Sequence, residues 1–173
     1  MKTTIGMILM VAVFLGCGLF GWQPEAEQGP VLRQVDGFCY AYMDFVGPYS
    51  LIGEKVKIFS GEFRKQGLEA TGDFLVIYYN SPRYNKKEDL RWAPSFPIKQ
   101  DTEVKPPLKK GVFKQMPCVV GIHTGPLEEI QQTNDKVKAY IDDNGYRMVW
   151  PAYEVFYANP EYVKIVHPVT RKK

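Results

Sequence analysis

The sequence has few of the residues that build metal sites and nucleophilic active sites. It contains two histidines and three cysteines among 173 residues, with neither a CxxC pair nor an HExxH motif. Structural and catalytic zinc sites depend on such residues at close spacing. No Ser-His-Asp or Cys-His arrangement is recognisable either. We therefore expect no metal site and no cofactor.

An excess of charge of one sign is also lacking. The 22 basic and 19 acidic side chains are interspersed and leave a formal charge of +3. Proteins that bind nucleic acid neutralise several phosphates with clustered lysines and arginines. No helix-turn-helix pattern precedes Asp36. The sequence therefore predicts no nucleic-acid partner.

Long uncharged runs are absent apart from one, from Ile5 to Trp22, which follows Lys2. This pattern predicts a signal sequence or membrane anchor over residues 1–22 and a tether over residues 23–35. The acidic residues that follow the run place the domain on the extracytoplasmic side, in the bacterial periplasm or at the cell surface. Cys17 leaves three alternatives open: a retained anchor, a chain lipidated at this cysteine, and a cleaved export signal.

The rest of the chain contains an internal repeat. A shift of 78 residues superimposes two long stretches without a gap, and the alignment runs as far as Tyr84 and Tyr162. Such self-similarity indicates two copies of one structural unit. The pairs that carry it include Gly47 and Gly125, Ile52 and Ile130, and Gly67 and Gly145. We assign copy one to about residues 36–100, a connector to about 101–111 and copy two to about 112–170.

Each copy is predicted to form a strand, a helix and two further strands. The helices begin after a Gly-Pro pair and end at Gly67 and Gly145, where glycine favours helix termination. Because Pro94 and Pro97 interrupt the last strand of copy one, we expect that strand to lie at a sheet edge or to be bulged. Cys39 and Cys118 fall on strands, where free buried thiols are favoured over a disulfide, although both remain open.

Glu154 is the exception in an apolar strand, "AYEVFYANP". It aligns with Val76 in copy one, so the fold itself does not need a carboxylate at this position. Strand alternation places Glu154 on the face of Phe156, and Val76 on the face of Tyr78. Two alternatives remain open for Glu154: it is solvated or paired with Arg147, or it is buried among aromatic rings and needs a partner.

Four ordered motifs resemble the GyrI-like small-molecule-binding family, the effector-binding domain attached to AraC-type and MerR-type regulators. These are "AYMDFVGPYSLIGE", "GDFLVIYYNSP", "LRWAPSFPI" and "GYRMVWPAYEVFYANP". The resemblance covers residues 36–169. It implies an α+β fold in which two pseudo-symmetric strand-helix-strand-strand modules form a concave antiparallel sheet with two helices and a central pocket.

The resemblance also implies a site and a function. Glu154 would be the anionic floor of a pocket that binds hydrophobic small molecules, cations among them. Its aromatic walls would be Tyr78, Phe156, Trp92 and Tyr42. The alternative is hydrolysis of electrophilic small molecules with Glu154 as general base, which we favour less than binding. Haem binding, with His123 or His167 as the iron ligand, ranks last.

Overall fold

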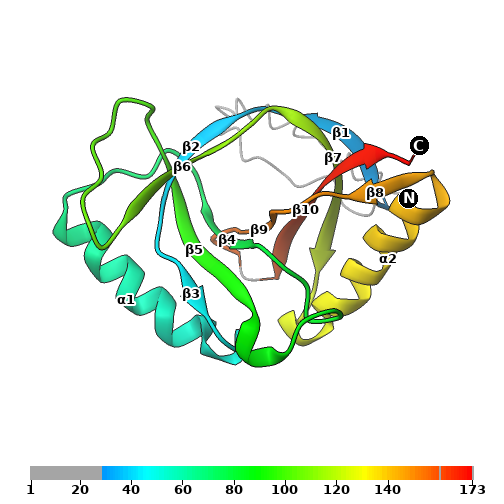
Figure 1. Ribbon diagram of the computed structural model, residues 1–173, viewed down its shortest axis with the longest axis horizontal. Coiled ribbons are helices and arrows are strands. Elements are labelled where there is room, and N and C mark those ends of the chain that lie inside the picture. Colours follow the sequence, from blue (N-terminus) through cyan, green and yellow to red (C-terminus); the bar gives the residue numbers. More distant parts are fainter. Residues whose placement is uncertain (1–28, 160, 173) are drawn as a thin grey trace, which may run out of the picture.

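Ten strands pair into one strongly curved antiparallel sheet, and two helices cover the same face of it at opposite ends (Figure 1). The computed structural model describes residues 29–159 and 161–172. The predicted signal or anchor at residues 1–22 lies outside the described residues. Within the described part of the chain, neither helix is long and apolar enough to span a membrane. The architecture confirms the predicted α+β fold class.

The regular elements follow one another as two similar series. The first comprises β1 (Val31–Val35), β2 (Phe38–Tyr42), β3 (Phe45–Val46), α1 (Ile52–Lys65), β4 (Phe74–Tyr78) and β5 (Arg91–Ile98). The second comprises β6 (Lys109–Phe113), β7 (Met116–Thr124), α2 (Ile130–Asp143), β8 (Tyr146–Met148), β9 (Ala152–Phe156) and β10 (Tyr162–Arg171). From β1 to β4 each element recurs 78 residues later, which is the shift that the sequence predicts.

The strand order β1-β7-β10-β9-β4-β5-β2-β6 shows the internal symmetry. Exchanging each strand for its counterpart in the other copy reads the same order backwards. The pseudo-two-fold axis therefore passes between β9 and β4, the two central strands. In their register Val76 lies directly opposite Glu154. The carboxylate that replaces a valine of copy one thus lies beside the symmetry axis.

The two copies exchange their first strands. β1 pairs with β7 of copy two, and β6 pairs with β2 of copy one. This corrects two predicted boundaries. Residues 31–35, assigned to the tether, form a strand of the sheet, and Lys109, assigned to the connector, begins another. Isolated strand signals of five residues flanked by polar segments are weak, and only pairing with a distant partner decides them.

β5 lies inside the sheet, which corrects the expectation of an edge strand. It pairs with β4 on one side and with β2 and β3 on the other. The ladder on the second side is interrupted between β2 and β3, where Met43 N donates to Pro94 O at 3.4 Å. Proline lacks a donor for a ladder, so an interrupted neighbour tolerates it.

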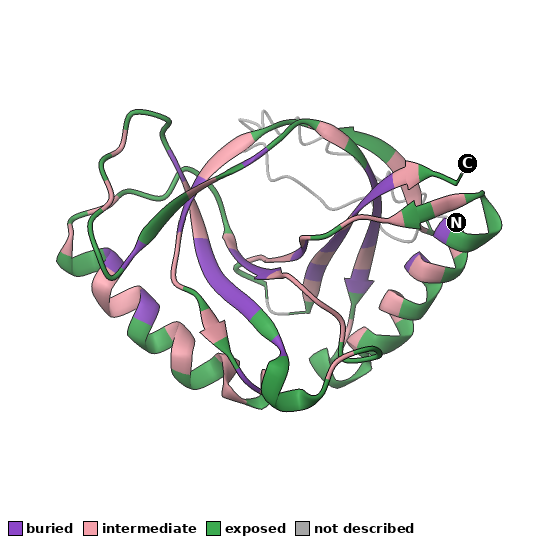
Figure 2. Ribbon diagram, viewed as in Figure 1, coloured by how far each residue is buried: buried purple, intermediate pink, exposed green. Residues whose placement is uncertain are grey.

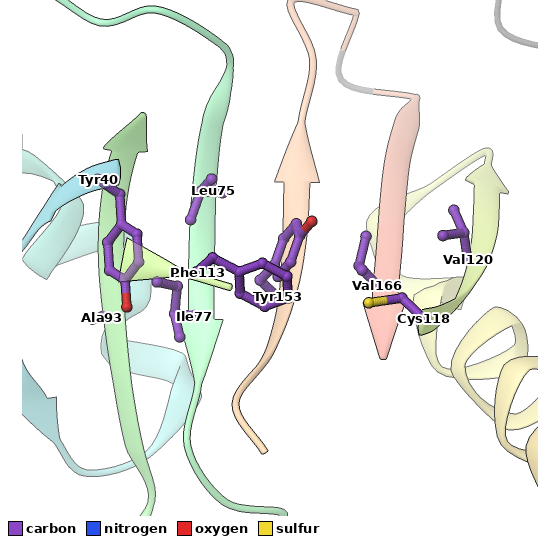
Figure 3. Close-up of a cluster of buried hydrophobic side chains, with 9 residues drawn as sticks. All are labelled: Tyr40, Leu75, Ile77, Ala93, Phe113, Cys118, Val120, Tyr153 and Val166. Atoms are coloured by element: carbon purple, nitrogen blue, oxygen red, sulfur yellow. The ribbon is translucent and has the colours of Figure 1, made fainter. Parts of the chain in front are cut away.

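Buried side chains form cores on both faces of the sheet. On the helix face, α1 packs Phe59 and Phe63 onto the sheet and α2 packs Val137 and Ile141. Figure 2 shows the outward sides of both helices exposed and β5 buried along most of its length. The other face is covered by the curled outer strands, which bring Phe113 onto Tyr153 with 5.0 Å between ring centroids (Figure 3). Both cores bury apolar surface, the dominant stabilising contribution to folding.

The copies differ most in the turn between their last two strands. Residues 79–90 connect β4 to β5, whereas residues 157–161 connect β9 to β10. The alignment of Tyr84 with Tyr162 is therefore wrong, since Tyr84 lies in the longer loop and Tyr162 begins β10. Beyond β4 and β9 the register of the copies changes: Val76 pairs with Pro94, and Glu154 with Ile165. The longer loop reaches the candidate site described next.

Candidate functional site

A cavity of about 620 Å³ opens on the helix face of the central strands. It lies beside the symmetry axis, and copy two supplies most of its wall. The longer loop of copy one contributes Arg83 and Tyr84. Its lining is Tyr49, Ile52, Tyr78, Ser81, Pro82, Arg83, Tyr84, Ile130, Gln131, Asn134, Asp135, Lys138, Met148, Trp150, Ala152, Tyr153, Glu154, Ile165 and His167. Volumes of roughly 300–1,000 Å³ are typical of small-molecule sites.

Glu154 lies at the floor of the cavity and is held by two neutral donors. The Tyr78 hydroxyl donates to Oε2 at 2.7 Å, and Asn134 Nδ2 donates to Oε1 at 3.2 Å. Among the described residues Glu154 forms no salt bridge, and Arg147, the partner considered from the sequence, lies on β8 beside β10. The carboxylate is therefore half-buried and hydrogen-bonded, without a neutralising cation.

Burial changes the proton affinity of these groups. Desolvation raises the pKa of the Glu154 carboxyl above its ordinary value, although the bonds from Tyr78 and Asn134 act in the opposite direction. Burial and the nearby Glu154 charge raise the pKa of Tyr49 to about 12, and the same causes raise the pKa of Tyr78 well above its ordinary value. Both tyrosines therefore remain neutral hydrogen-bond donors at physiological pH.

Aromatic rings form the walls around this carboxylate. Tyr49 meets Tyr78 edge to face, with ring centroids 5.1 Å apart, and its hydroxyl donates to the Asn80 carbonyl at 3.1 Å. Tyr84 and Trp150 also line the cavity and are 71% and 37% exposed. Their exposure means that they stand at its mouth. The cavity thus presents several π faces, which attract cations.

The structure brings together only two of the five residues that the sequence assigns to the site, Glu154 and Tyr78. Trp92 is fully buried, donates from its indole nitrogen to Gly47 O at 3.0 Å and packs on Phe45. Phe156 packs on Phe74 beside α1. These two residues are parts of the core and not cavity walls.

Tyr42 is the third residue that the structure places elsewhere. It packs against Tyr40 in the core on the helix-free face of the sheet, with 5.4 Å between ring centroids. The register explains this position. Tyr42 lies on β2, where it pairs with Ser95 of β5, and both β5 and β4 separate β2 from β9, the strand of Glu154. Tyr49, Tyr84 and Trp150 take the wall positions that were predicted for Trp92, Phe156 and Tyr42.

Two lining residues were missed as parts of the site, and the repeat held a signal for both. Asn134 is the one polar departure on the apolar stripe of α2 and aligns with Val56. His167 corresponds to Phe96, but only once the register change after β9 is known. Asn134 Oδ1 lies 3.4 Å from His167 Nε2, so both residues join the network of Glu154.

The second histidine and the cysteines lie apart from this network. His123 is buried outside the cavity, and its ring nitrogens contact Thr133 Oγ1 at 3.0 Å and Pro126 O at 2.9 Å. It therefore gives the haem hypothesis no support. Cys39 and Cys118 are free thiols. Among the described residues, no group of three or more His, Cys, Asp or Glu side chains is arranged to hold a metal ion.

Comparison with protein families identifies the chain. The GyrI-like small molecule binding domain matches residues 29–169, and so spans both copies and the cavity. The chain belongs to this family. A comparison with curated proteins finds no match. The family match begins before β1, in agreement with a domain that includes this strand.

Several solved structures share the GyrI-like fold. The EcmrR C-terminal domain has a TM-score of 0.71 and 16% identity, over 83% of this chain and 98% of that one. SAV2435 bound to tetraphenylphosphonium has a TM-score of 0.62 and 12% identity, over 83% and 94%. A hydrolase from Listeria innocua has a TM-score of 0.61 and 14% identity, over 86% and 94%. At these identities the likeness establishes the fold.

One comparison corrects the exclusion of nucleic acid. A cryo-EM structure of an EcmrR–DNA complex matches with a TM-score of 0.71 and 16% identity. The chain covers 57% of the EcmrR chain in that complex, and 83% of this chain is matched. The fold therefore occurs as one part of a larger DNA-bound protein. A mild net charge over the domain does not exclude nucleic acid as a partner of proteins with this fold.

The pH dependence of stability tests the burial of Glu154. Because burial raises its pKa above the ordinary 4.5, the folded chain keeps this proton to higher pH than the unfolded chain does. The resulting stability is fully present below about pH 4.5 and is lost as pH rises through the folded-state pKa. The melting temperature of Glu154→Gln should therefore increase relative to wild type between pH 4.5 and 8.

Thermal melts of the ligand-free protein at several pH values measure this difference. Glu128→Gln, a substitution of an exposed carboxylate on the turn before α2, controls for the loss of one negative charge. A melting difference between Glu154→Gln and wild type that stays constant over this pH range would contradict the burial of the carboxylate.

Proposed function

We propose that the cavity binds a hydrophobic organic cation and that Glu154 supplies the counter-charge. The observation that carries this proposal is a carboxylate at the floor of an aromatic cavity, held by two neutral donors and without a cationic partner in the described chain. A desolvated negative charge without a partner is unfavourable, and a bound cation would remove that cost.

The charges around the cavity agree with this proposal. Asp135 and Arg83 are exposed and stand near its mouth, where water screens them. Lys138 of α2 is half-buried and also lines the cavity but forms no salt bridge with Glu154. His167 is neutral at physiological pH, since burial lowers its pKa to about 4. Glu154 is therefore the charge that a ligand meets at the floor. The tetraphenylphosphonium bound to SAV2435, a protein of the same fold, is a ligand of this chemical class.

The test compares a hydrophobic cation with a neutral molecule of similar bulk. Tetraphenylphosphonium is expected to bind the purified full-length chain at least about tenfold more tightly than triphenylphosphine oxide, because only the cation gains the attraction of the carboxylate and the π faces. Isothermal titration calorimetry measures both dissociation constants. Equal affinities, or no binding of the cation, would overturn the proposal.

Hydrolysis of an electrophilic small molecule is the second candidate function. One observation favours it: Glu154 lies in a cavity with its pKa raised, as befits a carboxylate that acts as general base. A protein of the same fold is described as a hydrolase. Mass spectrometry of the full-length chain incubated with a hydrophobic epoxide would decide this candidate. Turnover that disappears in Glu154→Gln supports hydrolysis, and an unchanged epoxide removes it.

We also infer that the N-terminal segment delivers this domain to or across the membrane. The uncharged run from Ile5 to Trp22 and the preceding Lys2 support this location. Cell fractionation tests it: the full-length chain should appear in the membrane or periplasmic fraction, and Cys17→Ser should release it only if Cys17 is lipidated. A chain found entirely in the cytosolic fraction would contradict the inference.

A further inference from the structure

The polar residues at the cavity floor occupy positions that copy one fills with apolar side chains. The strand registers and the 78-residue shift match each of them with one residue of copy one. Glu154, Asn134 and His167 correspond to Val76, Val56 and Phe96. Because the same backbone is built twice, the apolar set shows that the fold needs none of these three polar groups. They are therefore candidates for contact with whatever occupies the cavity.

The direction of each hydrogen bond in this network follows from groups that can only accept. Asn134 Nδ2 faces both Glu154 Oε1 and the backbone carbonyl of Ile130, at 3.2 and 3.4 Å. A carbonyl cannot donate, so the amide nitrogen must lie on this side and Oδ1 must face His167. His167 Nε2, 3.4 Å from that oxygen, consequently carries a proton and donates.

This arrangement makes the other ring nitrogen of His167 an acceptor. In the neutral imidazole one nitrogen donates and the other accepts, so Nδ1 carries a lone pair. Nδ1 is buried and has no hydrogen-bond partner in the described part of the chain. Buried polar atoms without a partner are rare in folded proteins, and each one calls for an explanation.

Trp150 lies next to the His167 ring at the mouth of the cavity. Its ring meets the His167 ring edge to face, with 6.3 Å between centroids, and both residues line the cavity. Since Trp150 is 37% exposed, displacing its ring sacrifices little core packing. A ligand that moves the indole aside would gain access to His167 while its charge lies near Glu154.

We propose that His167 Nδ1 accepts a hydrogen bond from the ligand, so that the cavity selects hydrophobic cations that also carry a hydroxyl or N–H donor. This proposal rests on the proposed function, because Glu154 binds the cationic centre of the ligand and His167 binds a second group on the same ligand. It divides the cavity into a charge subsite and a donor subsite, both built from residues that copy one lacks.

The experiment uses three phosphonium probes with the same charge. They are tetraphenylphosphonium, (4-hydroxyphenyl)triphenylphosphonium and (4-methoxyphenyl)triphenylphosphonium, of which only the second carries a donor. Calorimetric titration of the full-length wild-type chain should show the hydroxyl probe binding about 5- to 10-fold more tightly than the methoxy probe, the gain from one buried hydrogen bond. Equal affinities for these two probes would overturn the proposal.

Two substitutions locate the preference at His167. His167→Phe introduces the residue that copy one carries at this position and leaves no hydrogen-bond acceptor there, so the hydroxyl preference, a ratio of two affinities for the same variant, should fall to about one. His167→Leu also lacks an acceptor and should give the same result if the phenylalanine variant does not fold. A hydroxyl preference that persists in a folded variant would overturn the donor subsite.

Failure of the proposed function gives a different result. If none of the three probes binds, or if all bind equally well to Glu154→Gln, the cation site itself is wrong and the donor subsite falls with it. If tetraphenylphosphonium binds in a manner that depends on Glu154 but the hydroxyl adds nothing, only the donor subsite is wrong.

Discussion

Glu154→Gln is expected to weaken the binding of tetraphenylphosphonium about 10- to 100-fold, because interactions with a charged group contribute about 1.5–3 kcal/mol. The glutamine keeps the size of the side chain, and its amide can accept from Asn134 Nδ2 while it donates to the Tyr78 hydroxyl oxygen, which can also act as an acceptor. The substitution therefore removes the charge and little else. Triphenylphosphine oxide, which is neutral, should bind wild type and Glu154→Gln within about twofold of each other.

Calorimetric titration of both ligands into both proteins measures this double difference. Glu128→Gln, which removes an exposed carboxylate outside the cavity, should leave the affinity for the cation within about twofold. Binding of the cation to the N-terminal segment or to detergent is common to all three proteins and cancels. If Glu154→Gln and Glu128→Gln reduce the affinity equally, the effect is one of net charge, and Glu154 is not the counter-charge.

Trp92→Ala is expected to lower the melting temperature by about 6–20 °C, since removal of a buried tryptophan costs about 3–5 kcal/mol in a chain of this size. Trp92 has no exposed surface, its ring packs on Phe45, and its indole donates to Gly47 O. The substitution would leave a cavity and an unpaired carbonyl. Its effect should appear in stability and not in ligand affinity.

Trp150→Ala is the matched variant, because it removes the same side chain from the mouth of the cavity. It should change the melting temperature by no more than a few degrees and weaken the binding of tetraphenylphosphonium about 2- to 10-fold through the loss of one cation–π contact. Trp92→Phe keeps an aromatic ring in the core and allows affinity to be measured on a folded protein. If Trp92→Phe loses affinity for tetraphenylphosphonium while Trp150→Ala does not, then Trp92 and not Trp150 contacts the ligand, and the assignment of the two tryptophans is wrong.

The two copies differ in how the space beside their helices is filled. In copy one the space beside α1 is filled by packed rings, with Phe59, Phe63, Phe74 and Phe96 in mutual contact. In copy two Val137 and Ile141 still pack on the sheet, but Ala152 and His167 stand where copy one has Phe74 and Phe96, and both line the cavity. A repeated fold thus provides an internal control, because a polar residue in one copy that is apolar in the other is dispensable for the architecture.

Two residues that line the cavity could be placed from the sequence because the evidence for them was local. Glu154 stood out because its counterpart in an ungapped alignment is Val76, and strand alternation correctly placed Tyr78 on the face of Val76. The prediction of the aromatic wall residues was less accurate. Strand alternation predicts the face of the sheet on which a side chain lies, but not where on that face it lies. Phe156 lies on the correct face yet packs under α1, away from the cavity.

The repeat, both helices and the position of the central carboxylate follow from local patterns in the sequence. Helical periodicity and the glycines Gly67 and Gly145, which adopt positive φ values of 64° and 72°, are local properties that need no distant partner. Four motifs, three in copy one and one in copy two, also carried enough of the family pattern to indicate the fold.

The exchange of strands between the copies and the side-chain contacts across the sheet depend on the tertiary structure and could not be predicted from local patterns. The pairing of β4 with β9 joins residues 74 to 82 positions apart, and the network of Glu154, Asn134 and His167 joins a strand, a helix and another strand. Such contacts depend on register and on loop length, neither of which the residues specify one by one. Because the 79–90 loop is longer than its counterpart in copy two, the last strands do not align at the 78-residue shift. The ungapped alignment of the sequence therefore did not pair His167 with Phe96.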